Sequence, residues 1–266
     1  MNIRKWHTLY SKDCRIKYNS ESTSKTYSYC VLKFLTHFKH EVEPKSISNT
    51  KIKDWLLTFE TLNTRKQMLC SIKSFYSLTI GMKNKLDKIP YPKKEKKLPK
   101  VIESEYLKET ILGVKNLKHK AILMIGYSCA LRVSEVINLK IEDIDSKRML
   151  ININNAKGRK DRIVVLSEIM LETLREYYKE YKPKEYLFNG QSRIQYSTAS
   201  CNKIVKKYLG ERFHYHMLRH SSATTMFENG TDISVIQKIL GHKKIETSLI
   251  YTHISRNKLR GAHLPI

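Results

Sequence analysis

The sequence lacks the features of a membrane protein or a secreted protein. It has no apolar run near the roughly 20 residues that are needed to cross a bilayer. Its first residues, Met1 to Trp6, lack the apolar core of a signal peptide. Its five cysteines are scattered, odd in number and without metal-type spacing, at Cys14, Cys30, Cys70, Cys129 and Cys201. We therefore expect a cytoplasmic protein with reduced thiols and no membrane partner.

Acidic side chains are also scarce. The 266 residues include 50 Lys and Arg against 25 Asp and Glu, which gives a net charge of +25. Charge of this size repels itself unless a polyanion is the usual partner. The excess is +14 over residues 1–100 and +11 over the remainder, so it is spread along the chain. A protein that holds DNA from two sides fits this distribution, whereas a membrane-surface protein usually concentrates its charge in one segment.

The front part of the chain, residues 1–87, is predicted to be a small helical bundle. Apolar side chains recur at helical spacing in three stretches between residues 27 and 80. We expect Ser22, Thr23 or Ser24 to cap the first of these helices and Gly81 to end the last. A chain that is 41% hydrophobic and 266 residues long has room for a real core in each of two domains.

A change of composition follows at residues 88–100. This segment contains three prolines and six lysines, with almost nothing to bury. Proline blocks helix continuation, and the charges favour an extended, solvated chain. The simplest interpretation is a linker, and it predicts a domain boundary here.

The remainder, residues 101–266, is predicted to be mostly helical with one small antiparallel sheet. Ile151 and Ile153 alternate with asparagines, and Ile163 and Val165 follow a polar turn. This period of two indicates a β-hairpin with its tip at residues 157–160. Helical spacing returns in four stretches, at 167–181, 198–209, 217–228 and 233–240. The predicted fold class is therefore mainly α.

Two arginines stand in short motifs that suit a phosphate. Arg132 lies in Ala-Leu-Arg-Val-Ser-Glu and opens a helix, and Arg219 lies in His-Met-Leu-Arg-His at the start of another. Two guanidinium groups can fork onto the non-bridging oxygens of one phosphate and stabilise a pentavalent transition state. Glu135, one turn after Arg132, is either an anchor for an active-site side chain or a solvated helix charge.

The histidines near Arg219 invite a metal interpretation, which the sequence does not favour. His216 and His220 are one turn apart, but Met217 stands where the zinc motif His-Glu-x-x-His has its glutamate. No carboxylate or thiol cluster stands nearby in the sequence. We therefore predict no metal site and interpret His220 as structural.

Tyr251 follows the run Leu240-Gly241-His242 by nine residues. A phenol with a pKa near 10 is a poor nucleophile while it is protonated. Arginines and a histidine around it would favour the phenolate and stabilise charge on phosphorus. This chemistry needs neither a metal nor another cofactor.

Together these motifs and their spacing closely resemble those of the tyrosine recombinase (phage integrase) family, and within it those of the short Xer-like members. The resemblance covers nearly the whole chain, and its specificity is concentrated between residues 129 and 254. It implies a SAM-like core-binding domain over 1–87, a basic linker over 88–100 whose lysines meet phosphates, and a catalytic domain over 101–266 with a C-terminal tail.

The resemblance also implies a role for each motif residue. Arg132, Arg219 and His242 would hold the scissile phosphate, His216 would assist proton transfer at the nucleophile, and Tyr251 would attack. The run 156–162 resembles the family's Gly-Lys-Gly-x-Lys-x-Arg hairpin, which makes Lys157 the general acid and Lys160 the alternative. A basic hairpin that only touches phosphate is the simpler interpretation of the same run.

The implied reaction is site-specific recombination through a 3′-phosphotyrosyl intermediate and a Holliday junction. The expected partner is double-stranded DNA with an inverted-repeat core site, bound by a homotetramer that is monomeric in free solution, with or without an accessory recombinase or regulator. The protein would then be cytoplasmic and associated with the nucleoid when on DNA. Because the chain starts directly in the helical domain, we expect it to read one core site and not distant arm sites.

Two other functions share parts of this pattern. One is a catalytically silent relative that recognises DNA without cutting it, and the complete set of motif residues counts against it. The other is a type IB topoisomerase or a hairpin-forming resolvase, which uses the same nucleophile. Two departures from the family pattern stand out, Ala130 where many relatives have glycine and Ser222 where an aromatic residue is common. The target site and the choice among integration, excision, inversion and dimer resolution do not follow from the sequence.

Overall fold

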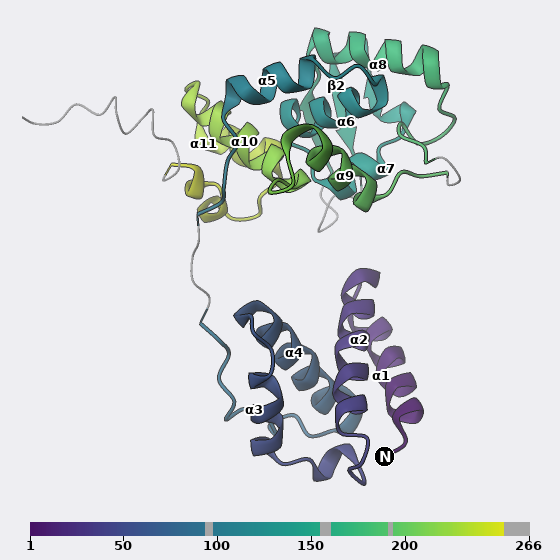
Figure 1. The fold of residues 1–266 in the computed structure, drawn as a ribbon, viewed down its shortest axis with the longest axis vertical. Coiled ribbons are helices and arrows are strands. Elements are labelled where there is room, and N and C mark those ends of the chain that lie inside the picture. The colour runs from purple at the N-terminus through teal and green to yellow at the C-terminus, as the bar shows by residue number, and fades with distance from the viewer. Residues whose placement is uncertain (94–97, 155–160, 191–193, 253–266) are drawn as a thin grey trace, which may run out of the picture. The chain divides into compact units, whose positions relative to one another are not determined.

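The computed structural model describes residues 1–93, 98–154, 161–190 and 194–252. The chain forms two compact units, Met1–Lys96 and Lys97–Ile266 (Figure 1). Both are largely helical, and the second contains a small antiparallel sheet, so the predicted fold class is confirmed. None of the helices among these residues is long and apolar enough to span a membrane.

The first unit is a bundle of four main helices. Its elements are α1 (Ile3–Lys17), α2 (Glu21–His37), the short turn η1 (Pro44–Ser46), α3 (Asn49–Leu57), α4 (Leu62–Phe75) and a π-helical turn η2 (Tyr76–Ile80). The helix starts are fixed by capping side chains, because the side chains of Asn2, Ser20, Ser48 and Thr61 each accept a backbone N–H of the first turn. The cap of α2 is thus Ser20, and the expected cap at residues 22–24 is wrong.

Aromatic side chains fill the core of this bundle. Phe34 lies at its centre and contacts Trp55, Phe75 and Tyr76 with edge-on rings at 5.5, 6.4 and 6.2 Å between centroids. Edge-to-face contacts of this kind add to the stability that apolar burial provides. Gly81 ends the last helix with a φ of 78°, as predicted.

The second unit carries the longer list of elements. They are α5 (Ser104–Leu112), α6 (Leu117–Ser128), α7 (Val133–Asn138), η3 (Ile141–Asp143), β1 (Ile144–Asp145), β2 (Leu150–Ile153), β3 (Arg162–Val165), α8 (Glu168–Tyr181), α9 (Thr198–Leu209), α10 (Tyr215–Glu228), α11 (Ile233–Leu240), η4 (Ile245–Thr247) and η5 (Leu249–Tyr251). The strands pair in the order β1-β2-β3, with Ile151 opposite Val164 in the buried face.

Helix α6 is the centre of this unit and packs against both α8 and α10. Its residues from Ala121 to Gly126 are all buried. Gly126 lets α10 come close, because a Cβ there would lie 2.7 Å from Cζ of Tyr215 and 3.1 Å from Cδ1 of Leu218. The close approach matters because α10 bears Arg219 and the two histidines of the His-Met-Leu-Arg-His motif.

Candidate active site

Arg219 lies at the bottom of the site and is 1% exposed. Its Nη1 donates to the carbonyl oxygen of Ala130 at 2.7 Å, and its Nη2 donates to the carbonyl oxygen of Leu240. Ala130 presents that carbonyl from a left-handed backbone, with a φ of 51°. This conformation favours glycine and is costly for other residues. Ala130, which stands where many relatives have glycine, therefore lies in a tight turn, and the carbonyl of that turn holds the Arg219 side chain.

Arg132 comes to the same place from the start of α7. Its Nη1 donates to Oε1 of Glu135 at 2.7 Å, and its Nη2 donates to the carbonyl oxygen of Leu240 at 3.1 Å. The carbonyl of Leu240 thus accepts from both arginines at the C-terminal end of α11. Arg132 and Arg219, which are 87 positions apart in the sequence, thus bind the same carbonyl oxygen.

Glu135 is the anion that holds these cations together. Besides Arg132, it binds Arg162 through two hydrogen bonds of 2.8 and 2.7 Å, and it lies 3.9 Å from Nη1 of Arg219. Burial alone would raise the pKa of Glu135, but the hydrogen bonds and charge of Arg162, and then Arg132, lower it to about 2. Of the two interpretations of Glu135, the structure therefore supports an anchor for active-site side chains.

Tyr251 is buried on η5 and is 1% exposed. It packs in a small apolar cluster with Ala130, Ala223, Ile236 and Leu240, next to both arginines. Its phenolic oxygen is 3.1 Å from Nδ1 of His220. Burial raises the pKa of the Tyr251 phenol, while the charges of Arg219 and Arg132 act to lower it.

His242 lies over the ring of Tyr251. The two rings are stacked, with centroids 6.5 Å apart and an interplanar angle of 11°. Gly241, which has a φ of 59°, ends α11 and turns the chain toward His242. Nδ1 of His242 is 2.9 Å from Oγ of the buried Ser248. Burial first, and then the charges of Arg219 and Arg132, lower the pKa of His242 to about 4, so the ring is neutral at pH 7.

His216 is the solvent-exposed member of the group. Its ring meets that of His220 edge-on, with centroids 4.7 Å apart and an angle of 84°. His220 thus lies between His216 and Tyr251, with its ring contacting both. The described part of the chain contains no cluster of His, Cys, Asp and Glu that could hold a metal ion.

Five of the six predicted site residues lie among the described residues, and the structure brings them together, namely Arg132, His216, Arg219, His242 and Tyr251. Lys157 lies outside the described residues, as do its alternative Lys160 and the tail after Thr252. Sequence reasoning missed the contact between Tyr251 and His220, because the sequence analysis interprets His220 as a structural residue. It also missed Arg162 as the partner of Glu135, although Arg162 is the last residue of the hairpin motif.

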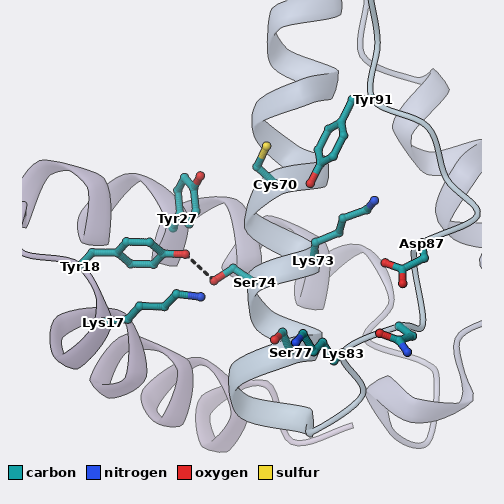
Figure 2. Close-up of a pocket in the computed structure, with 11 residues that line it drawn as sticks. Lys17, Tyr18, Tyr27, Cys70, Lys73, Ser74, Ser77, Lys83, Asp87 and Tyr91 are labelled. Carbon is teal, nitrogen blue, oxygen red and sulfur yellow. Dashed lines mark hydrogen bonds between the residues drawn. The ribbon is translucent and has the colours of Figure 1, made fainter. Parts of the chain in front are cut away.

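A second candidate site is a basic hollow in the first unit (Figure 2). Its volume is about 390 Å³, and it is lined by residues of α1, α2, α4 and the segment after Gly81. Tyr18 and Ser74 share a hydrogen bond of 2.8 Å at its wall, and the ammonium of Lys73 lies 4.4 Å from the centre of the Tyr91 ring. Three lysines, Lys17, Lys73 and Lys83, and one acidic residue, Asp87, line this hollow, so its formal charge is positive. Such a surface suits a phosphate of the DNA backbone.

Comparison with known proteins decides the family. The model of the phage integrase family matches residues 97–258. The chain belongs to the phage integrase family. It is 33% identical over 251 residues to the tyrosine recombinase XerA of Pyrococcus horikoshii, and this alignment covers 91% of this chain and 87% of that protein. It is 31% identical over 261 residues to the tyrosine recombinase XerD of Rickettsia bellii, with 85% and 86% covered.

A solved structure agrees with this assignment at the level of the fold. The XerH site-specific recombinase, bound to its palindromic difH substrate after cleavage, has a TM-score of 0.74 to this chain. It is 24% identical, and the match covers 96% of this chain and 83% of XerH. The predicted resemblance is confirmed, and the chain is a tyrosine recombinase, an enzyme that cleaves and rejoins DNA at specific sites.

Proposed function

We propose that this recombinase cuts DNA by direct attack of Tyr251 on a phosphodiester. The Tyr251 oxygen bonds to phosphorus, the bond between phosphorus and the 5′-oxygen breaks, and a 3′-phosphotyrosyl ester and a free 5′-hydroxyl remain. Because the ester keeps the energy of the diester, a 5′-hydroxyl from a second duplex rejoins it without ATP. Two such exchanges pass through a Holliday junction.

The observation that carries this proposal is the convergence of Arg132, Arg219, His242 and Tyr251 at the end of α11. Each guanidinium has five N–H donors, and Arg219 uses only two of them on protein carbonyls. We infer that the remaining donors bind the non-bridging oxygens of a phosphate. Arginine is suited to this task because its planar fork matches phosphate geometry.

The histidines and the hairpin complete the proposed reaction. We assign the Ser248 hydroxyl as the donor to Nδ1 of a neutral His242, which leaves the His242 proton on Nε2, where it donates to the phosphate. His216 assists proton movement at the nucleophile. Lys157 protonates the leaving 5′-oxygen, with Lys160 as the alternative. The complete set supports catalysis over a silent DNA-binding function.

We further propose a division of labour between the parts of the chain. Residues 1–87 bind the core site, residues 88–100 link the domains and meet phosphates, and residues 101–266 catalyse. The net charge of +25 and the basic hollow around Lys73 support wide contact with the DNA backbone. The proposed assembly is a homotetramer on two duplexes with inverted-repeat core sites, formed from monomers that are cytoplasmic before they bind the nucleoid.

Trapping the covalent complex tests this function. The protein is incubated without metal with supercoiled DNA spanning the flanks of its own gene, quenched in detergent, and the protein-linked DNA is sequenced. Wild type and Tyr127→Phe are expected to yield an adduct at paired inverted repeats, and Tyr251→Phe none. Tyr127 is a matched control because its phenol also hydrogen-bonds a side chain of α10, Thr225, at 3.1 Å.

Two results would contradict the proposal. An adduct that persists in Tyr251→Phe would assign the nucleophile to another residue. Relaxation of the supercoiled DNA with no joining between two recovered sites would instead support the topoisomerase alternative.

A further inference from the structure

The hydrogen-bond partner of the Tyr251 phenol is His220, and not one of the residues that the family resemblance places in the reaction. Nδ1 of His220 lies 3.1 Å from the phenolic oxygen. His242 has its own Nδ1 directed to Ser248, and its ring stacks on the face of Tyr251. His216 contacts the His220 ring and is one step further from the phenol.

The position of His220 is fixed by the same helix that holds the phosphate-binding arginine. His220 directly follows Arg219 on α10, and its backbone carbonyl accepts the hydroxyl of Thr224 at 3.0 Å. Its ring is held between His216, at 4.7 Å between centroids, and Tyr251, at 6.0 Å. A group at hydrogen-bond distance from the proton to be removed meets the first geometric requirement for a general base.

At pH 7 the ring of His220 is in the form that can accept a proton. Burial, followed by the nearby His216, Arg219 and His214 on α10, lowers the pKa of His220 to about 4. The ring is therefore neutral at pH 7 and has one nitrogen with a free lone pair. The negative charge of a DNA phosphate beside the arginines would offset the part of this lowering that Arg219 contributes, whereas the larger part, due to burial, would remain.

We propose that His220 is the general base that takes the phenolic proton of Tyr251 during cleavage and returns it during rejoining, an assignment that rests on the function proposed above. The O–H bond of Tyr251 breaks and an N–H bond forms at Nδ1, while the phenolic oxygen bonds to phosphorus. The bond between phosphorus and the 5′-oxygen breaks, its electron pair stays on the 5′-oxygen, and that oxygen takes a proton from the general acid. In rejoining, the 5′-hydroxyl attacks phosphorus, and the His220 imidazolium protonates the departing Tyr251 oxygen.

Two substitutions at this position separate proton transfer from positioning. His220→Asn keeps a polar atom near the place of Nδ1 that accepts a hydrogen bond but takes up no proton. His220→Ala removes both the hydrogen-bond acceptor and the nitrogen that takes up a proton, and it leaves space for added imidazole. His119→Asn is the matched control, because Nδ1 of His119, on α6, likewise hydrogen-bonds a tyrosine hydroxyl, that of Tyr208 at 3.0 Å.

The experiment measures single-turnover cleavage of a nicked duplex that carries the recovered site, from complexes formed before the reaction starts. We expect His220→Asn and His220→Ala to bind DNA and melt like wild type but to cleave about 100-fold more slowly or worse. Added imidazole should accelerate His220→Ala and leave His216→Ala unchanged, and the rejoining rate should fall together with the cleavage rate. His119→Asn should cleave like wild type.

Cleavage by His220→Asn within about threefold of wild type would overturn the proposal and leave His220 a positioning residue, because Asn holds the phenol without accepting its proton. Failure of imidazole to rescue His220→Ala would do the same. Absence of any adduct from wild type would contradict the proposed function itself, so the two failures are distinguishable.

Discussion

Glu135 and Arg162 form a paired set of hydrogen bonds, 2.8 and 2.7 Å long, that joins α7 to the first residue of β3. Arg162 also donates from Nε to the carbonyl oxygen of Ile239 at 2.7 Å, next to the Leu240 carbonyl that accepts from both other arginines. The ion pair, together with this hydrogen bond, therefore ties the second strand of the hairpin to the end of α11. It also gives Glu135 the orientation in which it holds Arg132.

We predict that Glu135→Gln weakens both stability and cleavage. The substitution keeps the shape of the side chain but leaves Arg162, whose side chain is 8% exposed, without its counter-charge. Removing one partner of a buried ion pair costs about 3 to 5 kcal/mol of unfolding free energy. Urea denaturation measures this loss, and binding of the recovered site measures the effect on Arg132.

Glu142→Gln is the control for this prediction, because its ion pair with Lys140, at 3.6 Å, is largely exposed. Exposed ion pairs contribute little, so its denaturation midpoint should match wild type. A Glu135→Gln protein as stable as wild type would contradict the role assigned to Glu135.

Acid is predicted to destabilise the catalytic unit in two steps. The pKa values of His220 and His242 are lowered to about 4 in the folded protein, below the usual 6.5 of an unfolded chain. Between these two values the unfolded chain binds more protons than the folded protein. The free energy of unfolding therefore falls as the pH drops from about 6.5 to 4. Glu135 has its pKa lowered to about 2, so its contribution is lost below about pH 4.3.

Denaturation midpoints between pH 7 and 3 measure both steps. His242→Asn should flatten the slope between pH 6.5 and 4, and Glu135→Gln should flatten the slope below pH 4.3. A stability that is unchanged from pH 7 to 4 in wild type would contradict the neutral, buried state of the two histidines.

We predict that Gly126→Ala forces α6 and α10 apart. The added carbon would lie 2.7 Å from Cζ of Tyr215, whose hydroxyl donates to the Ile122 carbonyl at 2.9 Å. Overpacking of this kind costs about 1 to 3 kcal/mol, and the shift of α10 should also slow cleavage because it moves Arg219 and His220. Thermal denaturation and single-turnover cleavage measure the two effects.

A double-mutant cycle tests whether the contact with Tyr215 causes the stability loss of Gly126→Ala. In a Tyr215→Leu background the side chain no longer reaches the added carbon, so the cost of Gly126→Ala should shrink. An equal cost in both backgrounds would show that the contact between these two residues is not responsible.

The basic hollow of the first unit is predicted to contact the DNA backbone. Lys73→Ala and Lys83→Ala should each lower the slope of log Kd against log salt by about 0.9 for the phosphate contact that is lost. Lys25→Ala is the matched control, because its ammonium is already paired with Glu21 at 2.7 Å. Affinity titrations between 50 and 300 mM salt measure the slopes, and equal slopes for all three variants would remove the hollow from the interface.

The sequence predicted the parts of the molecule that depend on local spacing. The two strands of the expected hairpin are present as β2 and β3, while its tip at 157–160 lies outside the described residues. The helix expected at 217–228 is present as α10 from Tyr215. Boundaries were less accurate, since Ser20 caps α2 in place of the serines and threonine that follow it. Several polar residues in a row offer equivalent caps, and only the packed helix distinguishes them.

The active-site residues were predictable because their motifs carry the resemblance, but their contacts were not. Glu135 and Arg162 are 27 positions apart, and His220 and Tyr251 are 31 apart. Such pairs form only when α7, α10, β3 and η5 pack together, and no local pattern encodes that packing. The turn at Ala130 is a partial exception, because the missing glycine marked the place where a left-handed backbone was needed.

In the proposed reaction Tyr251 itself becomes joined to the 3′-phosphate of the cut strand. The most direct measurement isolates the wild-type adduct, trims the DNA with nuclease, digests the protein with trypsin and sequences the modified peptide by mass spectrometry, with the free DNA end labelled by polynucleotide kinase. We expect a nucleotide on Tyr251 within the tryptic peptide 245–256, and a 5′-hydroxyl that the kinase labels without phosphatase treatment. A nucleotide on any other residue, or a 5′ end that needs phosphatase before labelling, would contradict it.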